Sequence, residues 1–417
     1  MGRTDVAQPA ATPASSGRDA SGSATATGAG PGGRRWRRLR RLLVALAVLA
    51  VVASAVVAVR RPWAIAVLIE GFPGHTWPAS GDAVEIGDAD ESPPIPTDRL
   101  RAGADFLIDF ESSDGSAIAV ARGGEIEFTH FAAGYGPDTA FNSYSMVKSL
   151  VGLLTVKAVS DGRIPDLDAT VGELWDDAAD SPVAGVTIRR LLDMRSQIVF
   201  EHEAGDVGGA GTSKEQAITY SPFSDFSRLH IEGPDAVIDH VEVVASEGDR
   251  FVYQNLNTAI LGRVIEEVGG RPLEVLLDEE IATPAGAGGF RWRRHDDGRV
   301  SAYCCLYATV AWWIAVGDHI LDNGGDQPLL SDDWHAYFFG LDLGEDVRGD
   351  GEYRSQTRYD VFDRDGEDLD GPFLYFSGRG GQVLYLVPDE DLVVVRFGQL
   401  NQRLHTTMYQ VAGFEPR

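Results

Sequence analysis

Ser145-Met146-Val147-Lys148 sets a hydroxyl and an amine three residues apart, in a chain that contains only three lysines. Side chains at positions i and i+3 of a helix lie on the same face, so the lysine amine can reach the serine hydroxyl. A neutral amine in that place can accept the hydroxyl proton, which makes a serine nucleophilic without a catalytic histidine. The pattern S-x-x-K is short and also arises by chance, so the surrounding residues have to support it.

The residues around Lys148 predict that it is buried. From Val147 to Val159, apolar side chains occur on nearly every face of a predicted helix that ends at Asp161-Gly162, and Asn142 and Ser143 before it offer N-cap side chains. A helix of this kind belongs in a protein interior. Lysine is rarely buried without a partner, and burial lowers the pKa of its amine because it disfavours the charged form. Lys148 should therefore have a partner or a catalytic role.

A second candidate group is Tyr253-Gln254-Asn255, on a predicted loop before a helix that runs from about Thr258 to Val268. A tyrosine hydroxyl next to an ammonium group ionises more easily and can act as an acid or base toward a leaving group. The amide of Asn255 could hold both the lysine and a substrate. Y-x-N is a weak pattern by itself, and a packed tyrosine with a capping asparagine also explains it.

A third candidate is the glycine-rich stretch Phe376-Ser377-Gly378-Arg379-Gly380-Gly381-Gln382, which leads into a strand predicted for Val383 to Val387. Glycines let a ligand approach a strand edge closely. Free N–H groups there, near Arg379, could bind an oxyanion together with the N–H of Ser145. An ordinary glycine-rich strand start or bulge is the alternative. These three patterns gain weight because they occur together and in this order.

Charge and cysteine content exclude several classes of protein. The formal charge of −27 combines +8 in residues 1–61 with −35 in the remainder. Nucleic-acid binders need a basic face to neutralise phosphates, so the acidic body argues against nucleic acid as a partner. Cys304 and Cys305 are the only cysteines, and adjacent cysteines cannot link distant segments. We expect two small buried side chains there.

The N-terminal region predicts membrane association. Residues 1–41 form a polar, partly polybasic segment that we expect to be disordered, and the uncharged apolar run Leu42–Val59 is just long enough to span a bilayer. Six arginines before this run outweigh Arg60 and Arg61 after it, which places the N-terminus in the cytoplasm and residues 62–417 outside. A signal sequence cleaved at Ala53-Ser54-Ala55 is the alternative, and it exports the same residues.

The remainder predicts a linker and one folded domain. Residues 60–99 are rich in Gly, Asp, Glu and Pro and are expected to be a linker, and residues 100–417 the domain. Its predicted elements are a hairpin over Ala117–Val120 and Glu125–Phe128, strands over Gln382–Val387 and Leu392–Phe397, and a closing helix over Asn401–Val411. Strands at both ends with helices between them indicate an α+β fold, in which an antiparallel sheet built from both chain ends is flanked by helices and carries a mainly helical insertion.

Together, Ser145-Met146-Val147-Lys148, Tyr253-Gln254-Asn255 and Ser377-Gly378 resemble the three motifs of the serine β-lactamase and penicillin-binding-protein superfamily. The flanking residues are similar to its class C-like branch, which includes aminohexanoate-dimer hydrolases and related esterases. The resemblance covers roughly residues 100 to 415. Its further matches are Phe141-Asn142-Ser143-Tyr144, Thr187-Ile188-Arg189-Arg190-Leu191-Leu192-Asp193-Met194, and Gly380-Gly381-Gln382 leading to Pro388.

The resemblance implies a role for each matching residue. Ser145 would be acylated by an amide or ester, Lys148 would activate it, and Tyr253 would be the acid or base toward the leaving group. Asn255 would position substrate, and the N–H groups of Ser145 and of a residue near Arg379 would bind the oxyanion. Water would then release the acyl group, so the resemblance implies neither a cofactor nor a metal.

One departure from the family pattern concerns the substrate. Relatives that bind a substrate carboxylate usually have Lys or His where this chain has Phe376, and Arg379 is the nearest replacement for that cation. The resemblance therefore favours uncharged or oligomeric small-molecule amides and esters over penicillins and peptide carboxylates.

Other functions have less support. The chain lacks the G-x-S-x-G pattern of α/β-hydrolases, and the ligand-rich Glu201-His202-Glu203 with Asp206 lacks metalloprotease spacing, so we interpret it as a solvated loop. The main alternative is a non-catalytic or weakly catalytic membrane-tethered sensor or ligand-binding module with a penicillin-binding-like pocket. The presence of all three motifs argues against this module, and the missing cation at Phe376 argues for it.

Overall fold

A computed structural model describes residues 31–90, 93–95, 108, 110–200, 220–244, 250–344, 352–360 and 373–400. The chain divides into two compact units, residues 1–59 and 60–417. Each unit is described by itself below.

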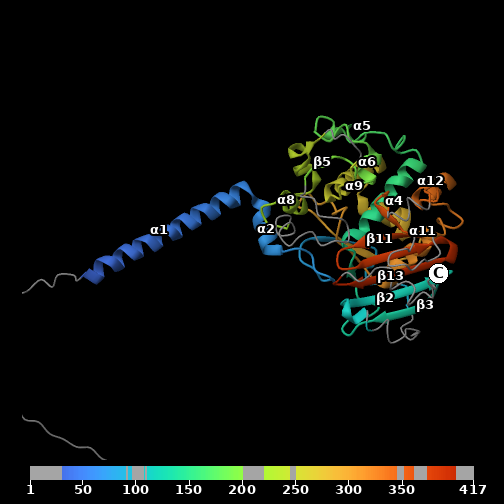
Figure 1. The fold of residues 1–417 in the computed structure, drawn as a ribbon, viewed down its shortest axis with the longest axis horizontal. Coiled ribbons are helices and arrows are strands. Elements are labelled where there is room, and N and C mark those ends of the chain that lie inside the picture. Colours follow the sequence, from blue (N-terminus) through green and yellow to red (C-terminus); the bar gives the residue numbers. More distant parts are fainter. Residues whose placement is uncertain are drawn as a thin grey trace, which may run out of the picture. The chain divides into compact units, whose positions relative to one another are not determined.

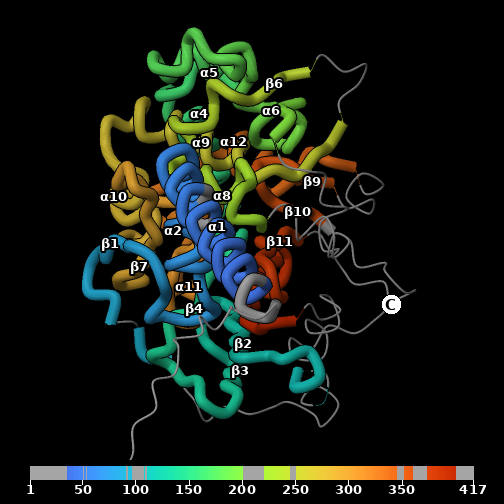
Figure 2. The backbone as a smooth tube through the Cα atoms, turned by 90° about the vertical axis from the view of Figure 1, so that its left-hand side faces the viewer, coloured from blue at the N-terminus to red at the C-terminus, as the bar shows by residue number. Residues whose placement is uncertain are grey.

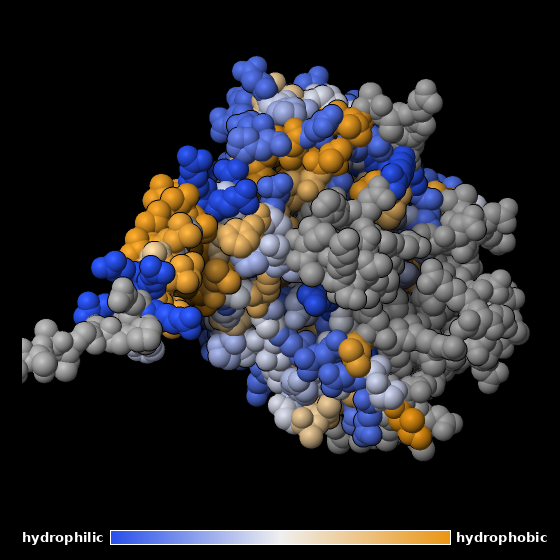
Figure 3. Space-filling view, turned by 60° about the vertical axis from the view of Figure 1, so that its left-hand side comes forward, coloured by the Kyte–Doolittle hydropathy of each residue, from blue (hydrophilic) through white to orange (hydrophobic). Residues whose placement is uncertain are grey.

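The described part of the first unit is a single long helix, α1 (Pro31–Arg60). Its segment Arg35–Arg60, 26 residues long, has the length and composition to cross a membrane. Large apolar side chains such as Leu43, Leu49 and Val59 are exposed along it. Figure 3 colours the surface by hydropathy and shows apolar residues in orange gathered next to hydrophilic ones in blue.

A seven-stranded antiparallel sheet forms the centre of the second unit (Figure 1). Its order is β3-β2-β13-β12-β11-β10-β9, so the strands that follow residue 110 pair with the strands nearest the C-terminus. The strands are β2 (Gly115–Arg122), β3 (Glu125–Phe131), β9 (Tyr353–Arg354), β10 (Thr357–Asp360), β11 (Phe373–Gly378), β12 (Gln382–Val387) and β13 (Leu392–Gly398). The predicted α+β fold with an antiparallel sheet from both chain ends is confirmed.

Local turn chemistry explains two of the hairpins. Gly123 and Gly124 join β2 to β3, and both have positive φ angles of 56° and 73°, which glycine adopts without steric cost. The short helix η6 (Pro388–Glu390) joins β12 to β13. Both hairpins match the predicted strands, whereas the predicted helix over Asn401–Val411 lies outside the described residues.

Helices cover one face of this sheet and enclose the larger hydrophobic core, which contains inward side chains such as Leu374, Leu384 and Val395. The opposite face has a smaller core around Phe110 and Tyr385. The helices are α4 (Val147–Ser160), α5 (Val171–Leu174), α6 (Ile188–Leu192), α8 (Asp225–Glu232), α9 (Asn255–Gly269), α10 (Leu273–Leu277), α11 (Val310–Leu321) and α12 (Asp332–Phe338), with short helices η1 (Tyr144–Met146), η2 (Asp176–Ala178), η3 (Pro234–Ala236), η4 (Ile238–His240) and η5 (Asp278–Ala282).

The linker predicted for residues 60–99 differs from the structure over much of its length. Pro62–Glu70 forms helix α2, which packs against α8, and Ala83–Ile86 forms strand β1 (Figure 2). β1 is the edge strand of a four-stranded sheet of order β1-β7-β8-β4, whose other strands are β4 (Phe141–Asn142), β7 (Phe290–Arg293) and β8 (Leu306–Ala308). A separate two-stranded sheet consists of β5 (Ile198–Val199) and β6 (Glu242–Val243). The local composition hides β1 because its partner β7 lies about two hundred residues away.

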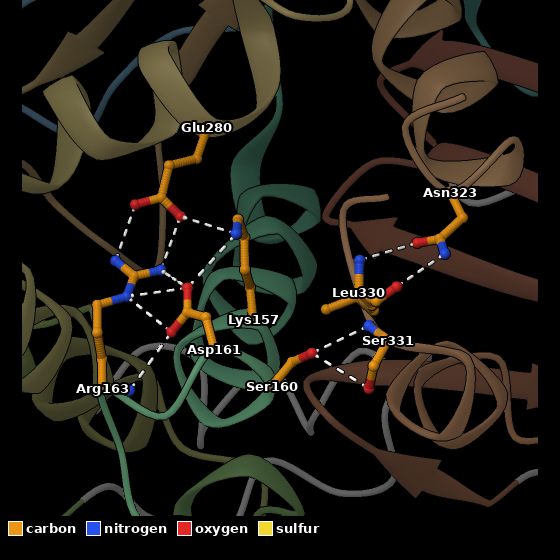
Figure 4. Close-up of polar contacts among 8 residues, drawn as sticks. All are labelled: Lys157, Ser160, Asp161, Arg163, Glu280, Asn323, Leu330 and Ser331. Carbon is orange, nitrogen blue, oxygen red and sulfur yellow. Dashed lines mark hydrogen bonds and ion pairs between the residues drawn. The ribbon is translucent and has the colours of Figure 1, made fainter. Parts of the chain in front are cut away.

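Charged side chains fix the C-terminal end of α4 (Figure 4). Arg163 donates two parallel hydrogen bonds of 2.8 Å to the carboxylate of Glu280 and also bonds Asp161. Lys157 lies 3.4 Å from Asp161 and 3.8 Å from Glu280. This network ties the end of the helix to the segment that contains η5.

Candidate active site

Ser145 lies in η1, a single turn between β4 and α4, rather than on α4 itself. Tyr144 before it has a φ of +43°, a conformation that non-glycine residues rarely adopt. Asn142 Oδ1 accepts the Tyr144 N–H at 2.9 Å, and the Ser143 carbonyl accepts the Met146 N–H at 3.0 Å. Asn142 and Ser143 therefore brace the turn that holds Ser145 instead of capping α4, as their sequence position had suggested.

Lys148 occupies the first turn of α4 with only 1% of its surface exposed. Its Nζ donates to Asn255 Oδ1 at 2.6 Å and to the Tyr303 carbonyl at 2.8 Å. The same nitrogen lies 5.4 Å from the centre of the Tyr253 ring. The structure thus brings the first and second sequence motifs together at Lys148, and it gives the buried lysine the partners that its burial requires.

The second motif stands at the start of α9. Asn255 is the first residue of this helix, so the helix begins three residues before the predicted start at Thr258. The preceding segment is fixed to the chain around Met194, because the Val252 N–H donates to the Met194 carbonyl at 2.8 Å. The half-buried ring of Tyr253 also packs edge-on against Tyr353, with ring centres 6.1 Å apart.

The third motif lies directly against the turn that carries Ser145. Ser377 and Gly378 are the last residues of β11, where they pair with β12. A Cβ atom on Gly378 would collide with the carbonyl oxygen of Ser143 and would lie 3.3 Å from the amide nitrogen of Met146. Only glycine fits so close to the turn that carries Ser145, which explains why this residue type occurs here.

Arg379 follows Gly378 and is exposed. Gln382 fixes this loop, because its Nε2 donates to the Arg379 carbonyl at 2.6 Å. The Arg379 guanidinium lies 5.1 Å from the centre of the Tyr220 ring. Burial raises the pKa of Tyr144, and the positive charge of Arg379 partly opposes that rise, so Arg379 lies near the turn that contains Ser145.

Phe376, where the family resemblance would lead one to expect a cation, is fully buried. Its ring packs edge-on against Phe338, with ring centres 6.5 Å apart, in the core between sheet and helices. An apolar side chain thus fills this place, and the nearest cation on the strand end is the exposed Arg379.

Sequence reasoning missed the part played by Tyr303. This residue accepts a hydrogen bond from Lys148 through its main-chain carbonyl, and its ring centre lies 5.0 Å from the lysine nitrogen. A contact through a main-chain carbonyl leaves no trace in the residue types, so no sequence pattern indicates it. The next two residues, Cys304 and Cys305, are joined as a vicinal disulfide instead of being two separate thiols.

Two buried histidines, His230 and His295, lie next to Tyr303. The Tyr303 hydroxyl lies 3.4 Å from His230 Nδ1, and His295 Nδ1 bonds the His230 carbonyl at 3.0 Å. Burial, together with the charge of Arg293, lowers the pKa of His295 to about 3 and moves the pKa of His230 well below its usual value. Both rings are therefore neutral at physiological pH and add no positive charge near Lys148.

No group of three or more His, Cys, Asp or Glu side chains in the described ranges is arranged to hold a metal ion. Glu201-His202-Glu203 and Asp206 lie outside those ranges.

Comparisons with known proteins agree with this geometry. The sequence model of the family named Beta-lactamase matches residues 109–409. The chain is 26% identical over 185 residues to a 6-aminohexanoate-dimer hydrolase of Paenarthrobacter ureafaciens, a match that covers 43% of this chain and 45% of that enzyme. The chain thus spans less than half the length of this curated relative.

Two solved structures share the fold. A Bacillus anthracis protein described as a candidate 6-aminohexanoate-dimer hydrolase has a TM-score of 0.60 and 17% identity, over 78% of this chain and 88% of that chain. A penicillin-binding protein of Bacillus halodurans has a TM-score of 0.54 and 16% identity, over 74% of this chain and 99% of that chain. With the family match over most of its length, the chain belongs to the beta-lactamase family.

Proposed function

We propose that this protein is a membrane-anchored, exported serine hydrolase that cleaves amide or ester bonds through a covalent acyl-serine intermediate. The observation that carries the proposal is the pair of hydrogen bonds from buried Lys148 to Asn255 and to the Tyr303 carbonyl. It is supported by the close approach of Gly378 to the turn that contains Ser145, and by the family to which the chain belongs.

The contacts of Lys148 suit a proton acceptor. The Lys148 amine donates to oxygens of Asn255 and Tyr303, and a neutral amine in this place has a lone pair that can take the proton of Ser145. Both of these acceptors are uncharged, and burial disfavours the ammonium form of a lysine. Lys148 therefore acts as the base that activates Ser145.

The reaction then follows the order of acyl transfer. Ser145 Oγ attacks the substrate carbonyl carbon, and the N–H groups of Ser145 and of a residue near Arg379 stabilise the oxyanion. Tyr253, whose ring adjoins Lys148, passes a proton to the leaving amine or alcohol as its bond to carbon breaks. Water attacks the acyl-serine in the second half, and the same groups return the proton to Ser145. Asn255 and Ser377 position the substrate.

The residue at 376 limits the class of substrate. An apolar ring in place of a cation leaves the strand without a buried partner for a carboxylate, and a buried unpaired carboxylate would cost several kcal/mol. We therefore expect uncharged or oligomeric amides and esters. The curated relative is named for an amide-bonded dimer, which is an example of the bond type but not of this chain's own substrate.

The anchor is part of the proposal. Leu42–Val59 would span the bilayer within α1, with residues 1–41 in the cytoplasm. The catalytic domain, predicted from the sequence over residues 100–417, would then lie outside the cell. A cleaved signal sequence is the alternative. Resistance of the full-length protein to alkaline carbonate extraction from membranes would support the anchor, and its release would contradict it.

The test of catalysis is labelling of Ser145. Full-length protein in membranes is treated with a fluorophosphonate probe and with a panel of esters, amides and β-lactams, and intact mass is measured. We expect adducts on the natural chain and none on Ser145→Ala. If neither chain is labelled, the non-catalytic ligand-binding module is the better explanation, and the mass of any acyl adduct identifies the acyl half of the substrate.

A further inference from the structure

Helix α2 exposes two large apolar side chains at its C-terminal end. Leu68 is 66% and Ile69 79% exposed, whereas Ala64 and Val67 on the other side of the helix are buried. The buried side packs against α8 (Figure 1, Figure 2). Phe223, two residues before the start of α8, is another exposed apolar side chain, at 47%.

Arginine and tryptophan side chains adjoin this apolar group. Arg61 donates to the Phe223 carbonyl at 2.9 Å. The guanidinium groups of Arg61 and Arg228 lie 6.0 Å and 5.0 Å from the Trp63 ring. Tryptophan is enriched at membrane interfaces, and arginine is attracted to anionic lipid headgroups, although Arg228 also pairs with Glu232 at 2.8 Å. We refer to Leu68, Ile69 and Phe223 with Arg61, Trp63 and Arg228 as the α2 surface.

Chain connectivity keeps the α2 surface near any membrane that α1 crosses. α1 ends at Arg60 and α2 begins at Pro62, so about 8 Å of chain separates them at two Cα steps. α2 has nine residues and is about 14 Å long. The chain therefore limits Leu68 and Ile69 to within about 22 Å of the end of α1, and burying them in a headgroup region would remove apolar surface from water.

The same segment leads into the candidate active site. Phe72 follows Ile69 by three residues, and its ring lies 5.3 Å from Tyr220 and 5.9 Å from Phe226. These two rings, 5.4 Å apart, form an aromatic cluster with Phe72.

Tyr220 and Phe226 of this cluster each contact a residue of the proposed active site. Tyr220 lies beneath the guanidinium of Arg379, and an N–H near Arg379 is a proposed oxyanion donor. Phe226 lies 6.0 Å from Tyr303, whose carbonyl holds Lys148. A continuous set of aromatic contacts thus connects the end of α2 with the residues around Ser145.

We infer that the α2 surface rests on the lipid bilayer, and that the substrates of this site are lipophilic amides or esters that reach Ser145 from the bilayer along the aromatic cluster. The inference rests on the proposed anchor and on the proposed hydrolase. The chemistry is unchanged: Ser145 Oγ forms a bond to the acyl carbon, the bond from that carbon to the leaving oxygen or nitrogen breaks, and water releases the fatty acid.

The first experiment measures contact with lipid. Full-length protein is reconstituted into vesicles of phosphatidylcholine and phosphatidylglycerol, with a bimane label on Leu68→Cys or Ile69→Cys and nitroxide-bearing lipids as quencher. Leu341→Cys is the control, because Leu341 is also apolar and 49% exposed but lies far along the chain from α2. We expect strong quenching at positions 68 and 69 and little at 341.

The second experiment measures substrate access in the same vesicles, with 4-nitrophenyl palmitate as the membrane-soluble ester and 4-nitrophenyl acetate as the water-soluble one. Replacing both Leu68 and Ile69 by Asp should lower palmitate turnover about tenfold, because two apolar contacts with the bilayer are lost. Acetate turnover should stay the same, and Leu341→Asp should change neither rate.

The outcomes separate this inference from the proposals on which it rests. Membrane docking is overturned if lipid quenching is equal at positions 68 and 341, or if the bimane is shielded by protein and not quenched by lipid. It is also overturned if the Asp variant loses palmitate and acetate turnover equally. The anchor and the hydrolase stand in each of these cases. Extraction of the natural chain by carbonate overturns the anchor and the docking together. Failure of the natural chain to cleave either ester overturns the hydrolase and the substrate class.

Discussion

The two ends of helix α4 carry one lysine each, and the two lysines have opposite surroundings. Lys148 at the N-terminal end is buried between the amide oxygen of Asn255 and the carbonyl of Tyr303. Lys157 at the C-terminal end is 20% exposed and lies among the carboxylates of Asp161 and Glu280. Carboxylates favour the ammonium form, whereas burial among uncharged oxygens does not. The same residue type on one helix is therefore a candidate base at one end and a structural cation at the other.

The backbone differs between the ends in the same way. The N-terminal end follows a turn in which Tyr144 has positive φ, and β11 presses against this turn through Gly378. Unfavourable backbone of this kind costs of order 1–3 kcal/mol and persists only where neighbours impose it. The C-terminal end is regular helix tied down by Arg163 (Figure 4). Four predictions test whether the N-terminal end of α4, with Lys148, serves catalysis while the C-terminal end, with Lys157, serves stability.

The largest expected effect is on Lys148. Lys148→Met should lower kcat about 10³-fold, because the proposed base for Ser145 is removed. Lys157→Met is the matched control and should change kcat less than about twofold, since its partners are structural. Ester hydrolysis at saturating substrate measures both. Equal losses in the two variants would contradict the distinction between the lysines.

Gly378→Ala should have the next largest effect on activity. The new methyl group collides with the Ser143 carbonyl, so the turn that carries Ser145 has to shift. A displacement of about 1 Å can cost about 100-fold in rate. Gly185→Ala is the control, because its side chain would meet nothing within 4 Å. An active Gly378→Ala enzyme would mean that β11 does not position the nucleophile.

Acid should destabilise the protein through His295, a buried histidine whose ring lies 6.2 Å from that of Tyr303. His295 has a pKa of about 3 in the folded chain and 6.5 in the unfolded one, so the unfolded state binds more protons between these values and stability falls as pH drops through that window. The free energy of unfolding should fall by up to about 1.4 kcal/mol per pH unit for this histidine alone.

His295→Asn keeps a hydrogen-bond donor but cannot be protonated, and it should flatten this slope in urea unfolding between pH 7 and 4. The exposed His240→Asn is its control and should leave the slope unchanged. At the other end of α4, burial would raise the pKa of Asp161, but the hydrogen bonds and charge of Arg163 outweigh burial and lower it. This carboxylate therefore loses its ion pairs only below its usual pKa.

The smallest effect concerns Arg163. Arg163→Met removes two charged hydrogen bonds to a partly buried carboxylate and should destabilise the protein by about 1–2 kcal/mol, with kcat per folded molecule unchanged. Arg189→Met breaks an exposed pair with Asp168 and should cost at most about 1 kcal/mol. Thermal unfolding compares the two. A loss of kcat in Arg163→Met would contradict this prediction, because it would mean that the C-terminal end of α4 affects the reaction.

Local patterns predicted much of the fold. The apolar run after Ser145 indicated α4, the glycine pair indicated the β2–β3 hairpin, and the strands of the last hairpin were found within a residue. Local patterns failed for β1 and for the turn η1. β1 depends on pairing with β7, and η1 depends on β11 packing against it. Neither dependence can be inferred from neighbouring residues.

In the candidate site, too, some residues could be predicted from the sequence and others could not. Ser145, Lys148, Tyr253, Asn255 and Gly378 could be named from motif order and family resemblance, and the structure gathers the segments that carry them. Tyr303 could not be named, because the group that contacts Lys148 is a carbonyl that every residue possesses. The contribution of Phe72 could not be named either, because it comes from a segment that looked like a linker.

The sequence by itself determined most of the elements of the central sheet and the helix α4, and which residue types stand at the ends of α4, because hydrophobic periodicity and turn chemistry act over a few residues. Only the tertiary structure decided what each lysine touches. The partners of Lys148 lie 107 and 155 positions away along the chain. Since the charge state of an amine depends on its burial and nearest partners, the chemical difference between two identical side chains arises only when distant segments pack together.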